Sequence, residues 1–140
     1  MSAAFVLDAS MAFAWVLPSQ ATTEAEALLE CVEAGDEGVV PPLWFLEVAN
    51  GLLVAERRKT VAAPERRLAL ERLSALALTI DEAHARDAFS RTSALAEQYG
   101  LSVYDAAYLE VAIRRNLPFG TRDRTLRSAA ERSGIPQFDH

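Results

Sequence analysis

The sequence predicts an α/β fold, a three-layer α/β/α sandwich with a central, mostly parallel sheet. Short apolar segments alternate along the chain with longer helical patterns, which is the order typical of parallel sheets. The short segments contain few polar residues, as strands that are buried on both faces do. With 140 residues and no internal repeat or linker, the chain has about the length of one domain, so we expect a single domain over residues 1–140.

The first segments predict one strand and two helices. Ala3–Leu7 is a short apolar run, and Met11–Leu17 follows with a helical pattern until Pro18 stops it. A second helix is expected from Thr22, whose hydroxyl can cap it, to about Glu33.

A short strand and a long helix are expected next. Val39 and Val40 follow a turn that contains two glycines, and they predict a short second strand. Prolines suit the start of a helix because the first helical N–H groups have no partner inside it, so the pair before Leu43 predicts a helix over Leu43–Arg58. Another helix, rich in Arg, Glu and Leu, opens at Pro64.

The remaining segments continue the alternation. Leu76–Ile80 is short and apolar and predicts a buried strand, followed by a helix over Glu82–Gln98 that Gly100 ends. Ser102 suits the start of the next helix, whose body is Ala106–Arg115. After it we expect a strand at Leu117–Gly120, a helix over Arg124–Ser133 and an edge strand at Ile135–Phe138.

Composition and charge limit the kinds of ligand. The net charge of −6 argues against general adhesion to nucleic acid, so a polyanion would need a local basic surface. No apolar stretch approaches the roughly 20 residues that cross a bilayer, and we expect a cytoplasmic protein without membrane contact. One cysteine excludes an internal disulfide, and the two histidines, His84 and His140, are interpreted as surface residues that form no zinc site. Any metal must therefore be bound by oxygen.

Three basic clusters are candidates for such a surface. We interpret the first two as helix ends that face water and are favoured there by the helix dipole. The clusters are Arg57 to Lys59, Arg114 with Arg115, and Arg122 with Arg124 and Arg127.

Four carboxylates occupy positions where an α/β chain least tolerates an unpaired ionised side chain. Asp8 ends the first apolar run, Glu47 lies inside an apolar helix, Asp105 begins a helix, and Asp123 follows the last predicted strand but one. In open α/β sheets, ligands bind beyond the carboxyl ends of the strands. Burying several unpaired carboxylates in one place needs a compensating cation. A cluster of these acids would therefore be a site for a hard divalent metal.

Each acid also has a plain structural interpretation. Asp8 and Asp123 can simply cap the helices that follow them, which contributes about 1 kcal/mol. Asp105 in a first helical turn is favoured by the dipole. A helix that is apolar nearly all round is expected to be buried, so Glu47 either belongs to a site or pairs with one arginine.

Three polar residues accompany these acids. Asn50, with Gly51, shares the helix face of Glu47 and would give an acidic, sterically open patch. Ser10 and Thr121 each lie two residues from an aspartate, and they can hydrogen-bond a carboxylate or satisfy their own turns.

The aromatic residues near these motifs are interpreted as packing residues. Tyr104 and Tyr108 flank Asp105 and are expected in the core or at its rim. Trp15, Trp44 and Phe45 fall on helical faces that need burial, so we expect them in the core or at an interface.

Four short motifs surround the acids, in the order Val6-Leu7-Asp8-Ala9-Ser10, Glu47-Val48-Ala49-Asn50, Leu101 to Tyr108, and Thr121-Arg122-Asp123. In this order they resemble the PIN-domain nucleases, and most closely the VapC-type toxins of bacterial toxin–antitoxin pairs. The resemblance covers nearly the whole chain.

The resemblance implies a PIN-like fold, a homodimer, an RNA substrate and a cognate antitoxin protein. We therefore predict a metal-dependent endoribonuclease that hydrolyses RNA phosphodiester bonds with Mg²⁺ or Mn²⁺ as cofactor. Several acids can fix such an ion and leave positions open for a phosphate oxygen. The implied site comprises catalytic and metal-binding Asp8, Glu47, Asp105 and Asp123, with supporting Ser10, Asn50 and Thr121.

Two other functions fit the same residues. A phosphatase would use Asp8 as a covalent nucleophile after a strand, although Ser10 rather than a second aspartate stands two residues later. A non-catalytic interaction module would use the acids only as helix caps, and its negative charge would recruit a basic protein.

Overall fold

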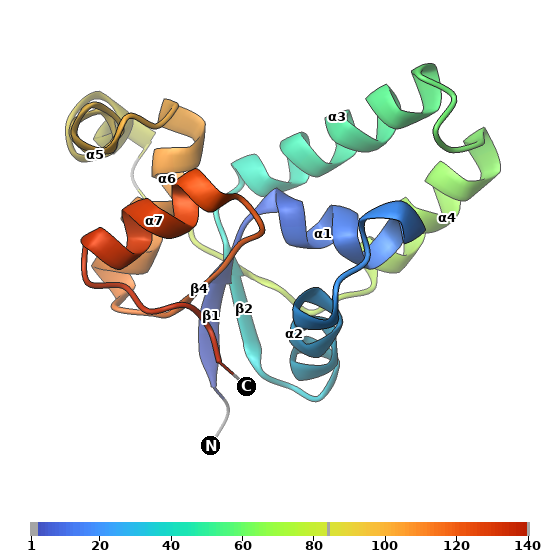
Figure 1. Ribbon diagram of the computed structural model, residues 1–140, viewed down its shortest axis with the longest axis horizontal. Helices are drawn as coiled ribbons and strands as arrows, with labels where there is room; N and C mark the ends of the chain where they lie inside the picture. The colour runs from blue at the N-terminus through green and yellow to red at the C-terminus, as the bar shows by residue number, and fades with distance from the viewer. Residues whose placement is uncertain (1–2, 84, 140) are drawn as a thin grey trace.

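A parallel sheet forms the centre of the protein (Figure 1). The computed structural model describes residues 3–83 and 85–139, so both histidines, expected at the surface, lie outside the described residues. Within these residues the sheet has four strands, in the spatial order β3-β2-β1-β4, and every strand pairing is parallel. The strands are β1 (Ala4–Leu7), β2 (Glu37–Val40), β3 (Thr79–Ile80) and β4 (Phe119–Gly120). The central strand β1 places Val6 opposite both Val39 and Phe119.

Helices cover both faces of the sheet, which confirms the predicted three-layer α/β/α fold. They are α1 (Ala9–Val16), α2 (Thr23–Glu33), α3 (Leu43–Arg57), α4 (Ala63–Ser74), α5 (Arg91–Tyr99), α6 (Val103–Arg115) and α7 (Arg124–Arg132). In Figure 1, α1 and α2 lie on one side of the strands, α6 and α7 lie on the other, and α3 and α4 extend away from the sheet as a pair. None of the described helices is long and apolar enough to span a membrane.

Local signals set several helix ends where the sequence predicts them. Thr22 accepts a hydrogen bond from the backbone N–H of Ala25, and Ser102 accepts one from that of Asp105, as N-cap residues do. Gly100 ends α5 in the left-handed conformation, with φ of 66°.

One predicted helix consists of two elements. Over Glu82–Gln98 the structure has a short 3₁₀ helix at Ala85–Phe89, followed by α5. Ser90 between them has a non-helical backbone (φ −121°, ψ −89°), and its N–H donates to the carbonyl of Asp87. Ser and Asp favour such local turns over a helix interior, so the prediction of one continuous helix is wrong.

The outer strands are shorter than predicted. In the segment Leu76–Ile80 only the last two residues pair with β2, because the N–H of Leu78 donates to the carbonyl of Leu76 in a local turn. The edge strand predicted at Ile135–Phe138 is reduced to a single bridge with β4.

Helix α3 is buried along one stripe only, so the expectation that it is buried all round is wrong. Trp44, Val48 and Leu52 recur every four residues and face the core. Leu46 is 74% exposed, and Phe45, expected in the core or at an interface, is also exposed. The helix extends away from the sheet together with α4, and none of the described helices or strands covers its outer side (Figure 1).

Gly51 allows α1 and α3 to approach closely. A Cβ atom at Gly51 would lie 2.1 Å from Phe13 Cζ. The ring of Phe13 therefore fills the space that was expected to form an open patch beside Glu47, and that expectation is wrong.

We expect the substitution Gly51→Ala to lower the free energy of unfolding by about 1 to 3 kcal/mol, as overpacking does. This loss is larger than the gain in stability that alanine normally gives over glycine inside a helix. Urea denaturation measures it, and the double variant Gly51→Ala/Phe13→Leu, with a smaller facing side chain, should recover part of the loss. A single variant more stable than the wild type would contradict this packing.

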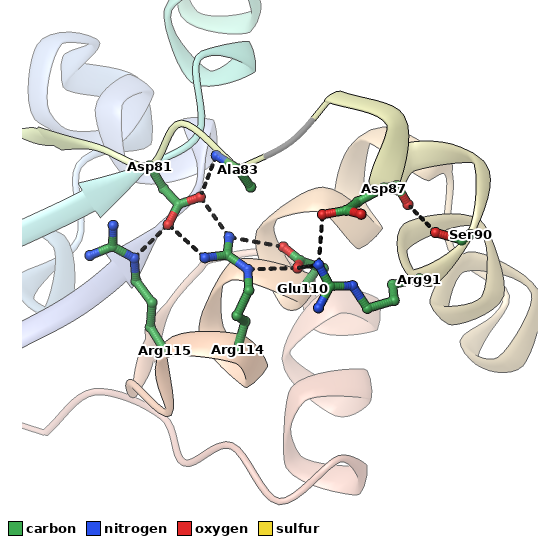
Figure 2. Close-up of polar contacts among 8 residues, drawn as sticks. All are labelled: Asp81, Ala83, Asp87, Ser90, Arg91, Glu110, Arg114 and Arg115. Atoms are coloured by element: carbon green, nitrogen blue, oxygen red, sulfur yellow. Dashed lines mark hydrogen bonds and ion pairs between the residues drawn. The ribbon is translucent and has the colours of Figure 1, made fainter.

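A cluster of ion pairs fastens the end of β3 to α6 (Figure 2). Asp81, only 2% exposed, binds Arg114 Nη2 at 2.6 Å and Arg115 Nε at 2.5 Å. Arg114 also contacts Glu110, one helical turn earlier, at 2.8 Å. Both arginines are partly exposed, as expected of helix ends, but their guanidinium groups bind a buried acid that the sequence did not link to them.

Candidate active site

Asp8 lies at the end of the central strand, and both of its carboxylate oxygens accept hydrogen bonds. Oδ1 accepts from the hydroxyl (2.5 Å) and the backbone N–H (3.1 Å) of Ser10, and Oδ2 accepts from the hydroxyl of Thr121 (2.5 Å). The same two hydroxyl oxygens accept from the backbone N–H groups of Arg122 and Asp123. Two side chains thus tie the loop after β1 to the loop after β4.

Burial makes the charge on Asp8 costly. Asp8 is only 5% exposed, and burial raises the pKa of its carboxyl group to about 6. The hydrogen bonds from Ser10 and Thr121 oppose this shift, while the negative charges of Asp105 and Asp123 add to it. The structure therefore brings three of the four predicted acids near one another.

Asp105 and Asp123 each stand at the start of a helix. Asp105 is in the first turn of α6, where burial and the charge of Asp123 raise its pKa against the effect of a hydrogen bond with Ser102. Asp123 caps α7 by accepting from the N–H of Leu126 at 3.0 Å, and Asp8 caps α1 in the same way. A carboxylate has about four acceptor sites, so capping does not exclude a second role.

Glu47 joins this group through Tyr108. The Tyr108 hydroxyl donates to Glu47 Oε1 at 2.5 Å. Burial, then the hydrogen bond and charge of Glu47, and then the charges of Asp8 and Asp105, raise the pKa of Tyr108 far above its usual value. The phenol therefore stays protonated and remains a donor. Because their charges act on Tyr108, the acids Glu47, Asp8 and Asp105 lie around its phenol group.

Sequence reasoning did not foresee this contact of Tyr108. It lies three residues after Asp105 and thus on the same face of α6, which is the signal that could have suggested it. Asn50 has a different outcome, because it is exposed on α3, and no hydrogen bond joins it to the acids within the part of the chain that the structure describes.

Asp8, Glu47, Asp105 and Asp123, called here the four-acid group, differ from Asp81 in having no positive partner among the described residues. Burial opposes ionisation of Asp81 too, but the hydrogen bonds and charges of two arginines bring its pKa below the ordinary value. None of the ion pairs among residues 3–83 and 85–139 includes a member of the four-acid group. The protein neutralises Asp81 with its own arginines, whereas among the described residues buried Asp8 has only hydrogen-bond donors, so its charge favours a proton or an external cation. Glu47 and Asp105 are half-buried, and Asp123 is exposed.

The donor atoms of the four-acid group suit Mg²⁺ or Mn²⁺. Carboxylate oxygens are the ligands that hard divalent cations prefer. In the described ranges, no three His, Cys, Asp or Glu side chains are already close enough to hold a metal ion. Like charges repel, so the carboxylates would have to converge when an ion binds. Their role as metal ligands stays a prediction.

The fold and the acids define an α/β protein with carboxylates gathered beyond the carboxyl end of the central strand. A search of the curated proteins found no match. Similar solved structures include PAE2754 from Pyrobaculum aerophilum, which is 23% identical and has a TM-score of 0.69, covering 91% of this chain and 79% of that chain. A toxin–antitoxin complex from Klebsiella pneumoniae is 22% identical, with a TM-score of 0.56, and the match covers 85% and 86% of the two chains. VapBC2 from Rickettsia felis, bound to a DNA fragment from the promoter, is 15% identical with a TM-score of 0.66, and covers 96% and 97%. At these identities the likeness shows the fold.

The family model of the PIN domain matches residues 5–132. This range includes all members of the four-acid group and nearly the whole chain. The chain therefore belongs to the PIN domain family.

Proposed function

We propose that this chain is a Mg²⁺- or Mn²⁺-dependent endoribonuclease of the VapC type and the toxin of a toxin–antitoxin pair. The observation that carries the proposal is Asp8, a buried carboxylate at the end of the central strand, whose pKa two neighbouring aspartates raise further. A protein that uses its acids only as helix caps gains nothing from such repulsion, whereas a cation-binding enzyme does. Membership of the PIN family, whose members are nucleases, supports the nuclease part of the proposal.

In this proposal the four-acid group holds the metal and supplies the catalytic residues. A bound divalent ion would polarise the phosphodiester and lower the pKa of a water molecule. Ser10 and Thr121 orient Asp8 through their hydroxyl groups, and Tyr108 orients Glu47. Asn50 stays a prediction as a supporting residue.

Arginines beside the acids would hold the RNA backbone. Arg122 and Arg127 line a cavity of about 380 Å³ at the start of α2. The backbone N–H of Arg122 donates to Ser10 Oγ, so the cavity adjoins the loop that carries Asp8. Glu24 lines the same cavity and pairs with Arg127 at 3.4 Å. Arg122 forms no ion pair among the described residues, so its charge can bind phosphate although the chain as a whole carries a net charge of −6.

The proposal includes a cognate antitoxin, a homodimer and a cytoplasmic location. A similar solved structure is a toxin–antitoxin complex, which supports the antitoxin. Leu46 on α3 and Val103 and Tyr104 on α6 expose apolar surface of the kind that a second copy could bury, which supports the homodimer.

The proposal is tested by incubating the purified chain with a pool of total bacterial RNA. We expect cleavage in Mg²⁺ or Mn²⁺, its loss in EDTA, and its recovery when excess metal is restored, because the chemistry needs the cation. Glu47→Gln should remove the activity, whereas Glu30→Gln, a matched change at an exposed position of α2, should not. New RNA ends, mapped by sequencing, are the readout.

Two results would favour the other functions. Hydrolysis of a simple phosphate ester without RNA cleavage would indicate a phosphatase, although hydrogen bonds to both oxygens of Asp8 weaken it as a nucleophile. A titration that detects no Mn²⁺ binding would favour a non-catalytic interaction module.

A further inference from the structure

The hydrogen bond between Tyr108 and Glu47 links two helices that each carry an acid of the site. Glu47 comes from α3 and Asp105 from α6, and Tyr108 lies on α6 three residues after Asp105. Residues at this spacing share a helix face. The helix that supplies one acid therefore also supplies a donor to another acid, 61 residues away in the sequence.

Tyr108 is held rigidly. It is 1% exposed, whereas Tyr104, one helical turn earlier, is 65% exposed. A buried aromatic ring packed in a core has little rotamer freedom, so its hydroxyl group points in one fixed direction. The hydrogen bond from this hydroxyl group therefore restrains the carboxylate of Glu47.

This bond makes the two oxygens of Glu47 unequal. Oε1 accepts the hydrogen bond from Tyr108, and within the described residues Oε2 accepts none. A hydrogen bond to a carboxylate withdraws electron density from the oxygen that accepts it. Oε2 is therefore the better ligand for a cation, and the plane of the carboxylate cannot turn freely to offer both atoms.

We propose that Tyr108 is a positioning residue that makes Glu47 a one-oxygen ligand and so favours Mg²⁺ and Mn²⁺ over Ca²⁺. Calcium accepts carboxylates through both oxygens and takes six to eight ligands at longer distances, whereas magnesium requires a compact octahedron. A glutamate that presents one fixed oxygen suits the smaller ions. The inference rests on the proposed function in that it takes Glu47 as a metal ligand.

The test compares Mn²⁺ and Ca²⁺ affinities of the wild type and Tyr108→Phe by isothermal titration calorimetry. Residues that orient a metal ligand typically contribute tenfold or more to affinity, so we expect about tenfold weaker Mn²⁺ binding. Ca²⁺ binding should weaken less or improve, because Glu47 is then free to offer both oxygens. Tyr104→Phe removes a hydroxyl from an exposed position of the same helix and should leave both affinities unchanged.

Two further measurements separate positioning from a general loss of stability. In a Glu47→Gln background, Tyr108→Phe should no longer change the Mn²⁺ to Ca²⁺ affinity ratio, because the residue through which it acts is already altered. A crystal structure of the wild type soaked in Mn²⁺ should show one Glu47 oxygen on the ion and the other on Tyr108. This structure needs no variant, so it tests the inference even if Tyr108→Phe does not fold.

The outcomes are distinguishable from failure of the proposed function. A wild type that binds no Mn²⁺ overturns both. A wild type that binds Mn²⁺ together with an unchanged affinity ratio in Tyr108→Phe overturns the role of Tyr108 alone, as would a Mn²⁺ ion bound equally by both oxygens of Glu47.

Discussion

Replacing Asp8 with asparagine should abolish metal-dependent RNA cleavage while it stabilises the metal-free protein at neutral pH. The carboxylate is buried, and its two neighbouring aspartates repel its charge. Asparagine has nearly the same shape and no charge, so the variant loses a strong metal ligand and also loses the cost of burying the ionised group. Activity and stability should therefore change in opposite directions.

The stability effect has a defined pH window. The folded-state pKa of Asp8 is about 6, raised from 3.8, so between these values the folded chain binds the proton more tightly than the unfolded chain does. The contribution of Asp8 to stability is complete below about pH 4 and is lost as the pH rises through about 6. Above that pH, the loss amounts to roughly 3 kcal/mol at 1.36 kcal/mol per pKa unit.

Chemical denaturation at a series of pH values measures this effect. The difference in free energy of unfolding between Asp8→Asn and the wild type should increase from pH 4 to pH 7 in EDTA. Added Mn²⁺ should stabilise the wild type more than the variant, because only the wild type keeps the aspartate ligand. Asp139→Asn, at an exposed position, serves as the control. Undiminished RNA cleavage by Asp8→Asn would rule out Asp8 as a catalytic residue, and a pH-independent difference would rule out its raised pKa.

Removal of Asp81 is expected to cause the second large effect, on stability alone. Asp81→Ala removes the buried carboxylate that binds Arg114 and Arg115, and it leaves Arg114 paired with Glu110 (Figure 2). Breaking a buried ion pair in this way costs about 3 kcal/mol, which corresponds to a fall in Tm of roughly 10 °C for a chain of this length. Differential scanning calorimetry measures the change, and Mn²⁺ affinity should be retained because Asp81 is not in the four-acid group.

The matched control lies in the same cluster. Asp87 pairs with Arg91 at 2.6 Å, and the Arg91 side chain is 57% exposed, so Asp87→Ala should cost less than about 1 kcal/mol, as exposed ion pairs do. Asp81→Asn keeps hydrogen-bonding capacity without charge, so its loss of free energy of unfolding should lie between those of Asp81→Ala and Asp87→Ala. Equal losses for Asp81→Ala and Asp87→Ala would contradict the structural importance of burial at Asp81.

Much of the fold was predictable because its signals are local. Apolar strands flanked by turns predicted β1 and β2, and the hydroxyls of Thr22 and Ser102 predicted two helix starts. The predictions failed where a local turn competed with a helix, and where a helix face has no neighbouring element among the described residues to bury it. Ser90 breaks a helix that its pattern favours, and Leu46 is exposed because α3 extends away from the sheet, which hydrophobic periodicity alone cannot reveal.

For the acids too, the sequence predicted part of the arrangement and the structure alone showed the rest. Asp8, Asp105 and Asp123 at strand and helix ends, with Glu47 inside an apolar helix, indicated a candidate site, and the resemblance to the PIN-domain nucleases implied that the four acids form it. Asp81 also follows an apolar segment, as Asp8 does, but the sequence analysis assigned it no partner and no role. Only the structure shows that two arginines satisfy Asp81, while the hydroxyl groups of Ser10 and Thr121 and the backbone N–H of Ser10 donate to Asp8.

By itself, the sequence determined the alternation of strands and helices, the helix caps and the placement of Asp8, Asp105 and Asp123 at element ends, because burial periodicity and capping act over a few residues. Tertiary structure alone decided the partner of each acid. Thr121 reaches Asp8 across 113 positions, and Tyr108 reaches Glu47 across 61. Such pairs form only when parallel strands and their crossover helices bring distant segments together, and no local pattern in the chain encodes that distance.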